Sequence, residues 1–311
     1  MKKALLLVLV FVAANSFAQK TEGELINVTA EAAKKAVDTT YSGWKTTGNF
    51  VFLFNQSAFN NEWLGGGTSN IAGNAGLNYD FNYKTSDLIW DNKFIASYGL
   101  TKIKGQETTK SDDRIEFTSL VGKKAKGYWF YSAFLNFKTQ MDVGFKKVTN
   151  DNGTPAVLTD DFDQRVTISH FFSPAYLQAG PGLLWKKSDN LKFNFAPATS
   201  RLIFVHKHFT EFGSAFGVEQ GKSSRFEFGA AVNGYYKFNI MENVSMENIL
   251  NLYSNYLDKP QNVDIDYQMN LVMKINKYIS TNIAFQAIYD DNAIGAFQIR
   301  EVFGLGFNYG F

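Results

Sequence analysis

The sequence predicts an all-β protein, a closed antiparallel transmembrane β-barrel of about twelve strands. Aromatic residues make up 16% of the 311 residues, with 30 Phe, 15 Tyr and 5 Trp, although the hydrophobic share is an ordinary 45%. Apolar and polar residues alternate in segments of about ten residues, the length at which a tilted strand crosses a bilayer. Short and long connections also alternate along the chain, as in outer-membrane barrels.

The chain ends on a strongly alternating segment, REVFGLGFNYGF. Successive side chains of a strand point to opposite faces, so one face is apolar and the other carries mainly Gly and Asn. In a membrane barrel, lipid covers such a face. A terminal strand that ends on Phe also resembles the signal read by the outer-membrane insertion machinery. The apolar positions of this expected signal are Phe303, Leu305, Phe307, Tyr309 and Phe311.

The N-terminus fits the three-part pattern of a secretory signal peptide at residues 1–18. Lys2 and Lys3 precede an apolar run that is too short for a membrane span, and small residues surround the cleavage point expected after Ala18. Removal of this segment takes away two lysines and no acids, so the formal net charge falls from +2 to zero. The chain therefore lacks the net positive charge that would suggest nucleic acid as a partner.

Two further parts follow the signal peptide. Residues 19–45 lack alternation and are rich in Ala, Glu and Lys, so we expect a periplasmic segment that is helical or mobile. Residues 46–311 form the predicted outer-membrane barrel. The chain has no Cys, which excludes disulfides and thiolate chemistry.

The predicted barrel closes between its first and last strands. In the first strand, Phe50, Phe52 and Phe54 face outward. Closure removes the unpaired edges that single strands expose, and an even strand count places both termini at the periplasmic side. Residues 138–186 leave the count open, because RVTISHFF within them fits a strand extension or half of an extra hairpin. Fourteen strands is thus the alternative, with ten less favoured. The twelve strands are expected to begin near residues 46, 71, 87, 114, 128, 172, 191, 226, 244, 263, 279 and 297.

The inward positions of these strands are rich in polar and charged residues, which a wet lumen tolerates and a dry one forces into pairs. We expect Glu247, Asp264 and Asp266 to face Lys274 and Arg300 across neighbouring strands. Two interpretations stay open: a structural salt-bridge network, which is favoured, and a charge filter for a small solute. The charged candidates are Asp80, Asp91, Lys93, Glu116, Glu227, Lys237, Glu247, Asp264, Asp266, Lys274 and Arg300.

No motif predicts an enzyme, a metal site or a cofactor. His206 and His208 share a face at the outer end of the seventh strand, with Glu211 following, but no Ser or Asp accompanies them in a diagnostic pattern. Ordinary loop histidines are the favoured interpretation. The GGG at 65–67 lacks the Lys-Ser/Thr of a phosphate loop and is expected at a loop tip anchored by Trp63.

Two segments, GGGTSNIAGNAGLNYDFNY and LIWDNKFIASYGLTK, resemble a family of Bacteroidota outer-membrane proteins catalogued as a domain of unknown function. The resemblance implies a barrel from about Trp44 to the end of the chain, but no activity and no site residues. Its motifs are carried by Trp63, Gly65, Gly66, Asn70, Trp90, Asp91, Asn92, Tyr98 and Gly99.

We therefore expect an integral outer-membrane barrel that acts as a narrow pore for small solutes. The alternative is an accessory structural subunit of a larger outer-membrane complex for protein insertion, secretion or uptake. A hydrolase is less favoured. The expected partners are outer-membrane lipid, the insertion machinery and other outer-membrane proteins. A soluble β-sandwich or a lipid-binding barrel remains the alternative fold.

Overall fold

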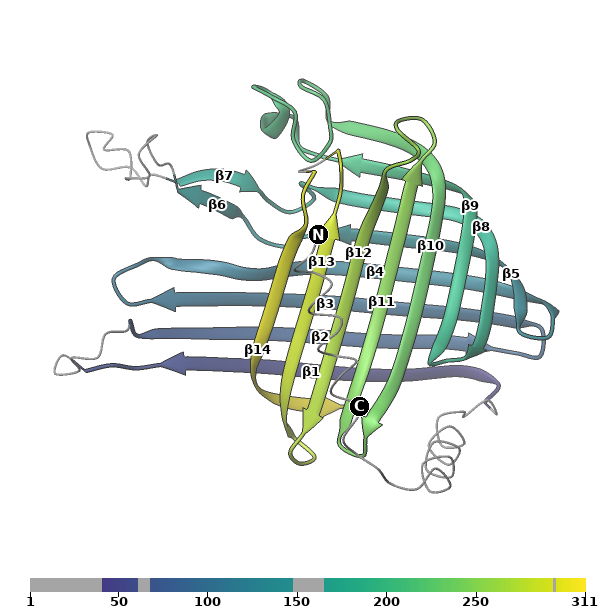
Figure 1. Ribbon diagram of the computed structural model, residues 1–311, viewed down its shortest axis with the longest axis horizontal. Helices are drawn as coiled ribbons and strands as arrows, with labels where there is room; N and C mark the ends of the chain where they lie inside the picture. Colours follow the sequence, from purple (N-terminus) through teal and green to yellow (C-terminus); the bar gives the residue numbers. More distant parts are fainter. Residues whose placement is uncertain (1–40, 61–67, 148–164, 293–294) are drawn as a thin grey trace, which may run out of the picture. The chain divides into compact units, whose positions relative to one another are not determined.

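The computed structural model describes residues 41–60, 68–147, 165–292 and 295–311. The predicted signal peptide, most of the 19–45 segment, and Trp63 with the GGG at 65–67 lie outside the described residues. Twelve strands form a closed antiparallel barrel, which confirms the predicted fold class (Figure 1). Around the barrel the order is β1-β14-β13-β12-β11-β10-β9-β8-β5-β4-β3-β2. The strands are β1 (Gly43–Ser57), β2 (Asn70–Lys84), β3 (Leu88–Ile103), β4 (Thr108–Lys126), β5 (Trp129–Thr139), β8 (Ala175–Ser188), β9 (Leu191–Phe204), β10 (Ser224–Met241), β11 (Val244–Asn255), β12 (Val263–Lys274), β13 (Ile279–Tyr289) and β14 (Gln298–Gly310).

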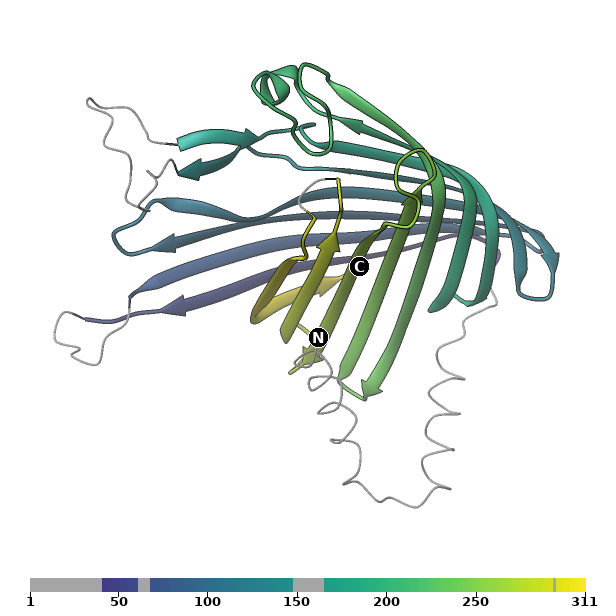
Figure 2. The same cartoon turned by 45° about the horizontal axis from the view of Figure 1, so that its top comes forward.

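The open question over residues 138–186 resolves as an extra hairpin outside the barrel. Strands β6 (Gly144–Lys147) and β7 (Arg165–Ser169) pair only with each other (Figure 2). The segment RVTISHFF thus supplies β7 and does not extend a barrel strand. Fourteen strands are present among the described residues, and twelve of them form the barrel.

Connections of two kinds join the strands. At one end, here called the turn end, short turns link β2–β3, β4–β5, β8–β9, β10–β11 and β12–β13, and Gly127 adopts a positive φ of 61° in one of them. The opposite end, here called the loop end, carries the other connections. The alternation of short and long connections predicts a long loop at residues 102–113. The structure has a turn of four residues there instead, because β4 begins at Thr108 and is 19 residues long.

The outward face is apolar as predicted. Phe50, Phe52 and Phe54 of β1 are exposed, and so are all five apolar residues of the predicted C-terminal signal. The chain closes on itself where β1 pairs with β14 in the register Phe52↔Phe307. Within the described part of the chain, the only helical element is the short η2 (Lys207–Thr210), and no helix there is long and apolar enough to cross a membrane.

Part of the inward face is also apolar, which the alternation did not predict. A buried cluster follows the wall from β3 to β11 and narrows the lumen on that side. Two glycines of β8, Gly180 and Gly182, allow β8 to lie very close to β9 beside this cluster. A Cβ atom on either glycine would lie only 2.6 Å from a carbonyl oxygen of β9. The cluster consists of Ile89, Leu120, Phe134, Leu184, Ala196, Ala231 and Tyr253.

Candidate functional site: the lumen of the barrel

The lumen contains two cavities. The turn-end cavity is about 270 Å³ in volume and the loop-end cavity about 880 Å³. Asn136 of β5 and Asn251 of β11 line both of them. The two spaces therefore meet at the same stretch of wall, and the side chains there decide whether they are continuous.

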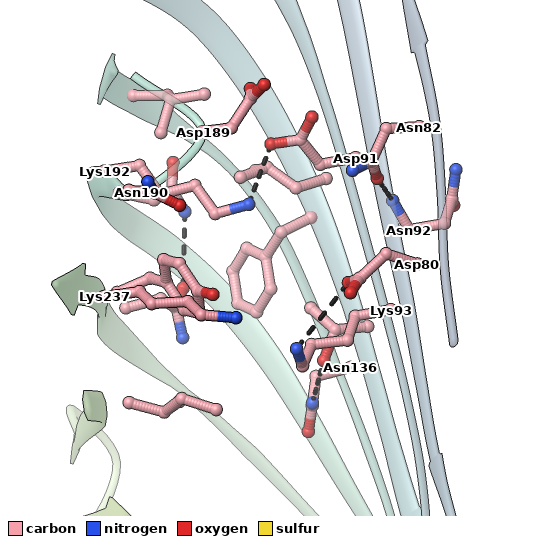
Figure 3. Close-up of a pocket in the computed structure, with 18 of the residues that line it drawn as sticks. Asp80, Asn82, Asp91, Asn92, Lys93, Asn136, Asp189, Asn190, Lys192 and Lys237 are labelled. Atoms are coloured by element: carbon pink, nitrogen blue, oxygen red, sulfur yellow. Dashed lines mark hydrogen bonds and ion pairs between the residues drawn. The ribbon is translucent and has the colours of Figure 1, made fainter. Parts of the chain in front are cut away.

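Asp91 organises the charges at the turn-end cavity, where Figure 3 shows it among neighbouring lysines and amides. Lys186 of β8 and Lys192 of β9 each donate a hydrogen bond to its carboxylate, with 2.8 Å from Nζ to oxygen. Asp91 is 5% exposed, so both lysines neutralise a buried carboxylate. β8 and β9 are neighbours in the barrel, whereas β4 and β5 separate β8 from β3, so this ion-pair group spans part of the lumen.

Lys93 and Glu247 form a bridge between opposite walls. The Nζ of Lys93 lies 3.2 Å from Oε1 of Glu247, and β3 and β11 are six strands apart in either direction around the barrel. Tyr235 donates a hydrogen bond of 2.8 Å to the same carboxylate, and Asn270 donates one of 3.3 Å. Asp80 lies 3.6 Å from Lys93 on the neighbouring strand. Side chains alone thus connect the two walls at this level.

A second row of bridges lies toward the loop end. Nη2 of Arg114 on β4 contacts Glu116 at 2.6 Å and donates to Oε1 of Gln268 on β12 at 2.9 Å. β4 and β12 are again opposite each other in the strand order. Lys138 of β5 forms an ion pair with Asp266 of β12. The lumen is therefore crossed twice by polar side chains between the cavities.

Arg201 contacts three acidic residues in the wall of the loop-end cavity. Its guanidinium pairs with Asp264, contacts Asp290 at 3.0 Å and lies 3.6 Å from Glu227. The ring of Tyr253 faces the guanidinium, with 4.9 Å from Cζ to the ring centroid. A second arginine, Arg225, lies 2.8 Å from Glu227. Three acids and two arginines together leave this part of the wall with a net negative charge.

Loop-end segments form the outer rim of the larger cavity. Phe209, Ala215 and Phe216 of the β9–β10 loop line it, together with Ile168 of β7. The loop is packed on the barrel by a buried cluster of Ile203, Val205 and Val218. The cavity thus has an apolar rim and a charged floor.

The structure places the predicted lumen residues in the wall, but with other partners than expected. Glu247, Asp264 and Asp266 do not face Lys274 and Arg300 on neighbouring strands. They pair instead with residues of β3, β9 and β5, because the lumen is narrow enough for side chains to reach across it. Arg300 pairs with Asp112 of β4 at 2.7 Å.

Two predicted residues do not take part in the bridges. Lys274 is exposed at the turn end and has no ion pair with any described residue, because its position at the end of β12 places it beyond the bridges. Lys237 lines the turn-end cavity without a salt bridge among the described residues.

Sequence reasoning missed the basic half of most bridges. Arg114, Lys138, Lys186, Lys192 and Arg201 all supply partners to predicted acids. A signal was present for some: Lys138 stands two residues after Asn136 and therefore on the same face. For Arg201 there was no such signal. The β8–β9 pairing has a register shift, after which odd-numbered instead of even-numbered residues of β9 face the lumen, so alternation counted from Asn194 places Arg201 on the wrong face.

His206 and His208 lie exposed in the β9–β10 loop. His206 Nδ1 accepts a 3.3 Å hydrogen bond from the His208 amide, and His208 lies 3.9 Å from Glu211 with both side chains exposed. No group of three or more His, Asp or Glu side chains within the described ranges is placed to hold a metal ion.

Comparisons with known proteins find barrels of low similarity. An outer membrane channel from Pseudomonas putida F1 has 12% identity over 87% of this chain and 95% of its own, with a TM-score of 0.36. The translocator domain of autotransporter NalP from Neisseria meningitidis has 8% identity over 92% and 95%, with a TM-score of 0.34. For the outer membrane channel DcaP of Acinetobacter baumannii the identity is 11% over 86% and 97%, with a TM-score of 0.26. Values this low give no information about function.

At the level of sequence, no curated protein matches the chain. The match to a family lies in the first third of the barrel, where the strand motifs of β2 and β3 had suggested a domain of unknown function. Residues 54–145 match the model of the family described as a protein of unknown function, DUF3078.

Proposed function

We propose that the chain is an integral outer-membrane barrel whose lumen is a narrow, gated pathway for small polar solutes. The outward aromatic and aliphatic side chains support the membrane location, since exposure to water of so continuous an apolar face is unfavourable. In this orientation the turn end faces the periplasm and the loop end faces the exterior.

One observation carries the pathway. The two cavities share Asn136 and Asn251, and the described groups that cross the lumen between them are side chains. A Lys–Glu or Arg–Gln contact opens by rotation about side-chain bonds, without any break in the strand pairing. The barrel can therefore remain intact while the two cavities become continuous.

The chemistry of the bridges favours small zwitterions. A solute that carries both an ammonium and a carboxylate group offers replacement partners to Glu247 and to Lys93 when their mutual contact at 3.2 Å opens. A neutral or singly charged solute leaves at least one of the two lumen charges without a partner, which is costly in a narrow polar site. Size is limited by the smaller cavity of about 270 Å³.

The test is solute uptake by liposomes that contain the purified protein. Uptake of a small amino acid should exceed that of an amine or a carboxylic acid of the same size, and a trisaccharide should be excluded. Liposomes without protein give the background. Uptake equal to this background for every solute would contradict the proposal.

A second candidate is an accessory structural subunit of a larger outer-membrane complex. The observation that favours it is the completeness of the pairing: Asp91, Glu116, Glu247 and Asp266 each have a basic partner within the lumen. Charges that neutralise each other in this way also suit a barrel that stays closed. Absence of uptake in the liposome experiment would leave this candidate as the better one.

A further inference from the structure

The seam that closes the barrel is paired over only part of its length. β1 pairs with β2 along all fifteen of its residues, but with β14 only from Asn49↔Gly310 to Phe54↔Leu305. β14 continues toward the loop end as Gln298–Gly304, and there only β13 pairs with it among the described strands. In Figure 1, β14 turns away from β1 beyond the paired stretch.

The direction of the free backbone groups follows from the last residue of the chain. Phe311 exchanges both backbone hydrogen bonds with Gly48, at 2.7 and 2.9 Å, so its N–H and C=O point toward β1. In an antiparallel strand every second residue points the same way. Ile299, Glu301 and Phe303 therefore direct three N–H and three C=O groups at the open side of the seam.

These groups lie within the outward apolar surface. At the loop end the exposed ring of Phe297 contacts that of Tyr289, with the ring centroids 5.3 Å apart and the ring planes tilted by 46°. Glu301 is four residues below Phe297, roughly 10 Å toward the middle of the barrel for a strand tilted as in membrane barrels. Hydrocarbon offers no hydrogen bonds to such an edge, so an uncovered edge is unfavourable there.

Glu301 adds a charge to this edge. It is exposed on the outward face between Ile299 and Phe303, and no described residue forms an ion pair with it. A second copy is a poor occupant, because two barrels inserted in the same direction and related by a twofold axis would bring equivalent glutamates together. Charge complementarity selects a basic partner instead.

We propose that the open edge of β14 at Gln298–Phe303 docks an extended strand of another outer-membrane protein that carries a Lys or Arg level with Glu301. The strand supplies backbone hydrogen bonds to Ile299, Glu301 and Phe303, and the basic side chain neutralises the carboxylate. The proposal concerns the outer wall of the barrel and holds whether or not the lumen conducts solutes.

Amide hydrogen exchange on the full chain tests the edge. We compare native outer-membrane vesicles with purified protein in phospholipid liposomes, so both samples hold a bilayer. The edge amides of 298–304 should exchange about tenfold or more slowly in the native vesicles, while β12 amides, paired on both sides, should be equally protected in both samples. Protection in both samples would mean that lipid or the chain itself covers the edge, and rapid exchange in both would mean a water-lined seam. Either result would overturn the proposal.

The charge is tested by Glu301→Lys, with Glu242→Lys in the exposed β10–β11 turn as the matched control. In native vesicles Glu301→Lys should lose the protection, and the control should keep it. Heat-modifiable gel mobility confirms that both variants form the barrel. Unchanged protection in Glu301→Lys refutes the basic partner.

The occupant is identified by p-benzoylphenylalanine in place of Ile299, with the same probe in place of Ile265 on β12 as control. The crosslinked peptide should contain Lys or Arg within two residues of the adduct, and the crosslink should disappear in Glu301→Lys. Crosslinks to a second copy, or equal crosslinks from both positions, would contradict the assignment.

Discussion

Replacement of both members of the Lys93–Glu247 bridge by Ala tests whether side chains close the lumen. The two groups are 3.2 Å apart, with side chains 20% and 16% exposed. A hydrogen bond between charged groups contributes about 1.5–3 kcal/mol, and 1.4 kcal/mol corresponds to a factor of ten in occupancy. If the two rows open independently, loss of one bridge raises the time-averaged conductance by about tenfold or more.

The double change is preferred because both charges leave together. Lys93→Ala alone would leave Glu247 without its basic partner in the lumen, a change that costs about 3–5 kcal/mol and would confuse conductance with unfolding. The assay is conductance in planar bilayers at equal numbers of inserted barrels. The matched control is Glu219→Ala with Lys222→Ala, an exposed loop pair at 2.6 Å that removes the same two charges. Equal conductance in wild type, variant and control would refute the account of the closed lumen.

Three further predictions concern the stability and assembly of the barrel. Asp91→Asn removes the buried carboxylate that Lys186 and Lys192 share, and only Lys186 keeps a second acid, Asp189 at 2.9 Å. The free energy of unfolding in micelles should therefore fall by about 3–5 kcal/mol, and a fall below about 1 kcal/mol would show that the group is well solvated. Leu184→Ala removes a fully buried side chain from the inward apolar cluster and should lower the free energy of unfolding, measured by urea titration in micelles, by about 2–5 kcal/mol. Leu183→Ala on the outward face should lower it much less. Deletion of Phe311 removes both backbone hydrogen bonds to Gly48 at the seam and should reduce the fraction of folded barrel, measured by the change of gel mobility on heating. An unchanged folded fraction would mean that the six remaining residue pairs between β1 and β14 are enough to close the barrel.

The alternation of side chains determined most of the fold because its period of two is a local property. β9, β11, β12 and β13 begin at the predicted residues, and the predicted outward aromatics of β1 and β14 are exposed. The strand bounds at the loop end were harder to predict, since β4 begins with a run of polar residues that carry no alternation of hydrophobicity. The hairpin β6–β7 is short and lies outside the barrel, so the same pattern did not separate it from a barrel strand.

The partners of the lumen charges could not be read from the sequence for a different reason. Inward position follows from parity, but which residues meet across the lumen depends on barrel closure and on the relative stagger of strands six places apart. Lys93 and Glu247 are separated by 154 residues, and no local signal links them. The expectation of neighbouring-strand partners for Glu247 was wrong because side chains from opposite walls reach each other across the narrow lumen.

The most direct test of the central claim uses the absence of Cys from the chain. Asn251→Cys places a single thiol at the wall shared by both cavities, and Lys222→Cys places one on the exposed β9–β10 loop. A small charged thiol reagent, added from the loop side to barrels in a planar bilayer, should stop the current through the Asn251→Cys protein and leave the Lys222→Cys current unchanged. Modification of Asn251→Cys without any loss of current would contradict a pathway through the lumen.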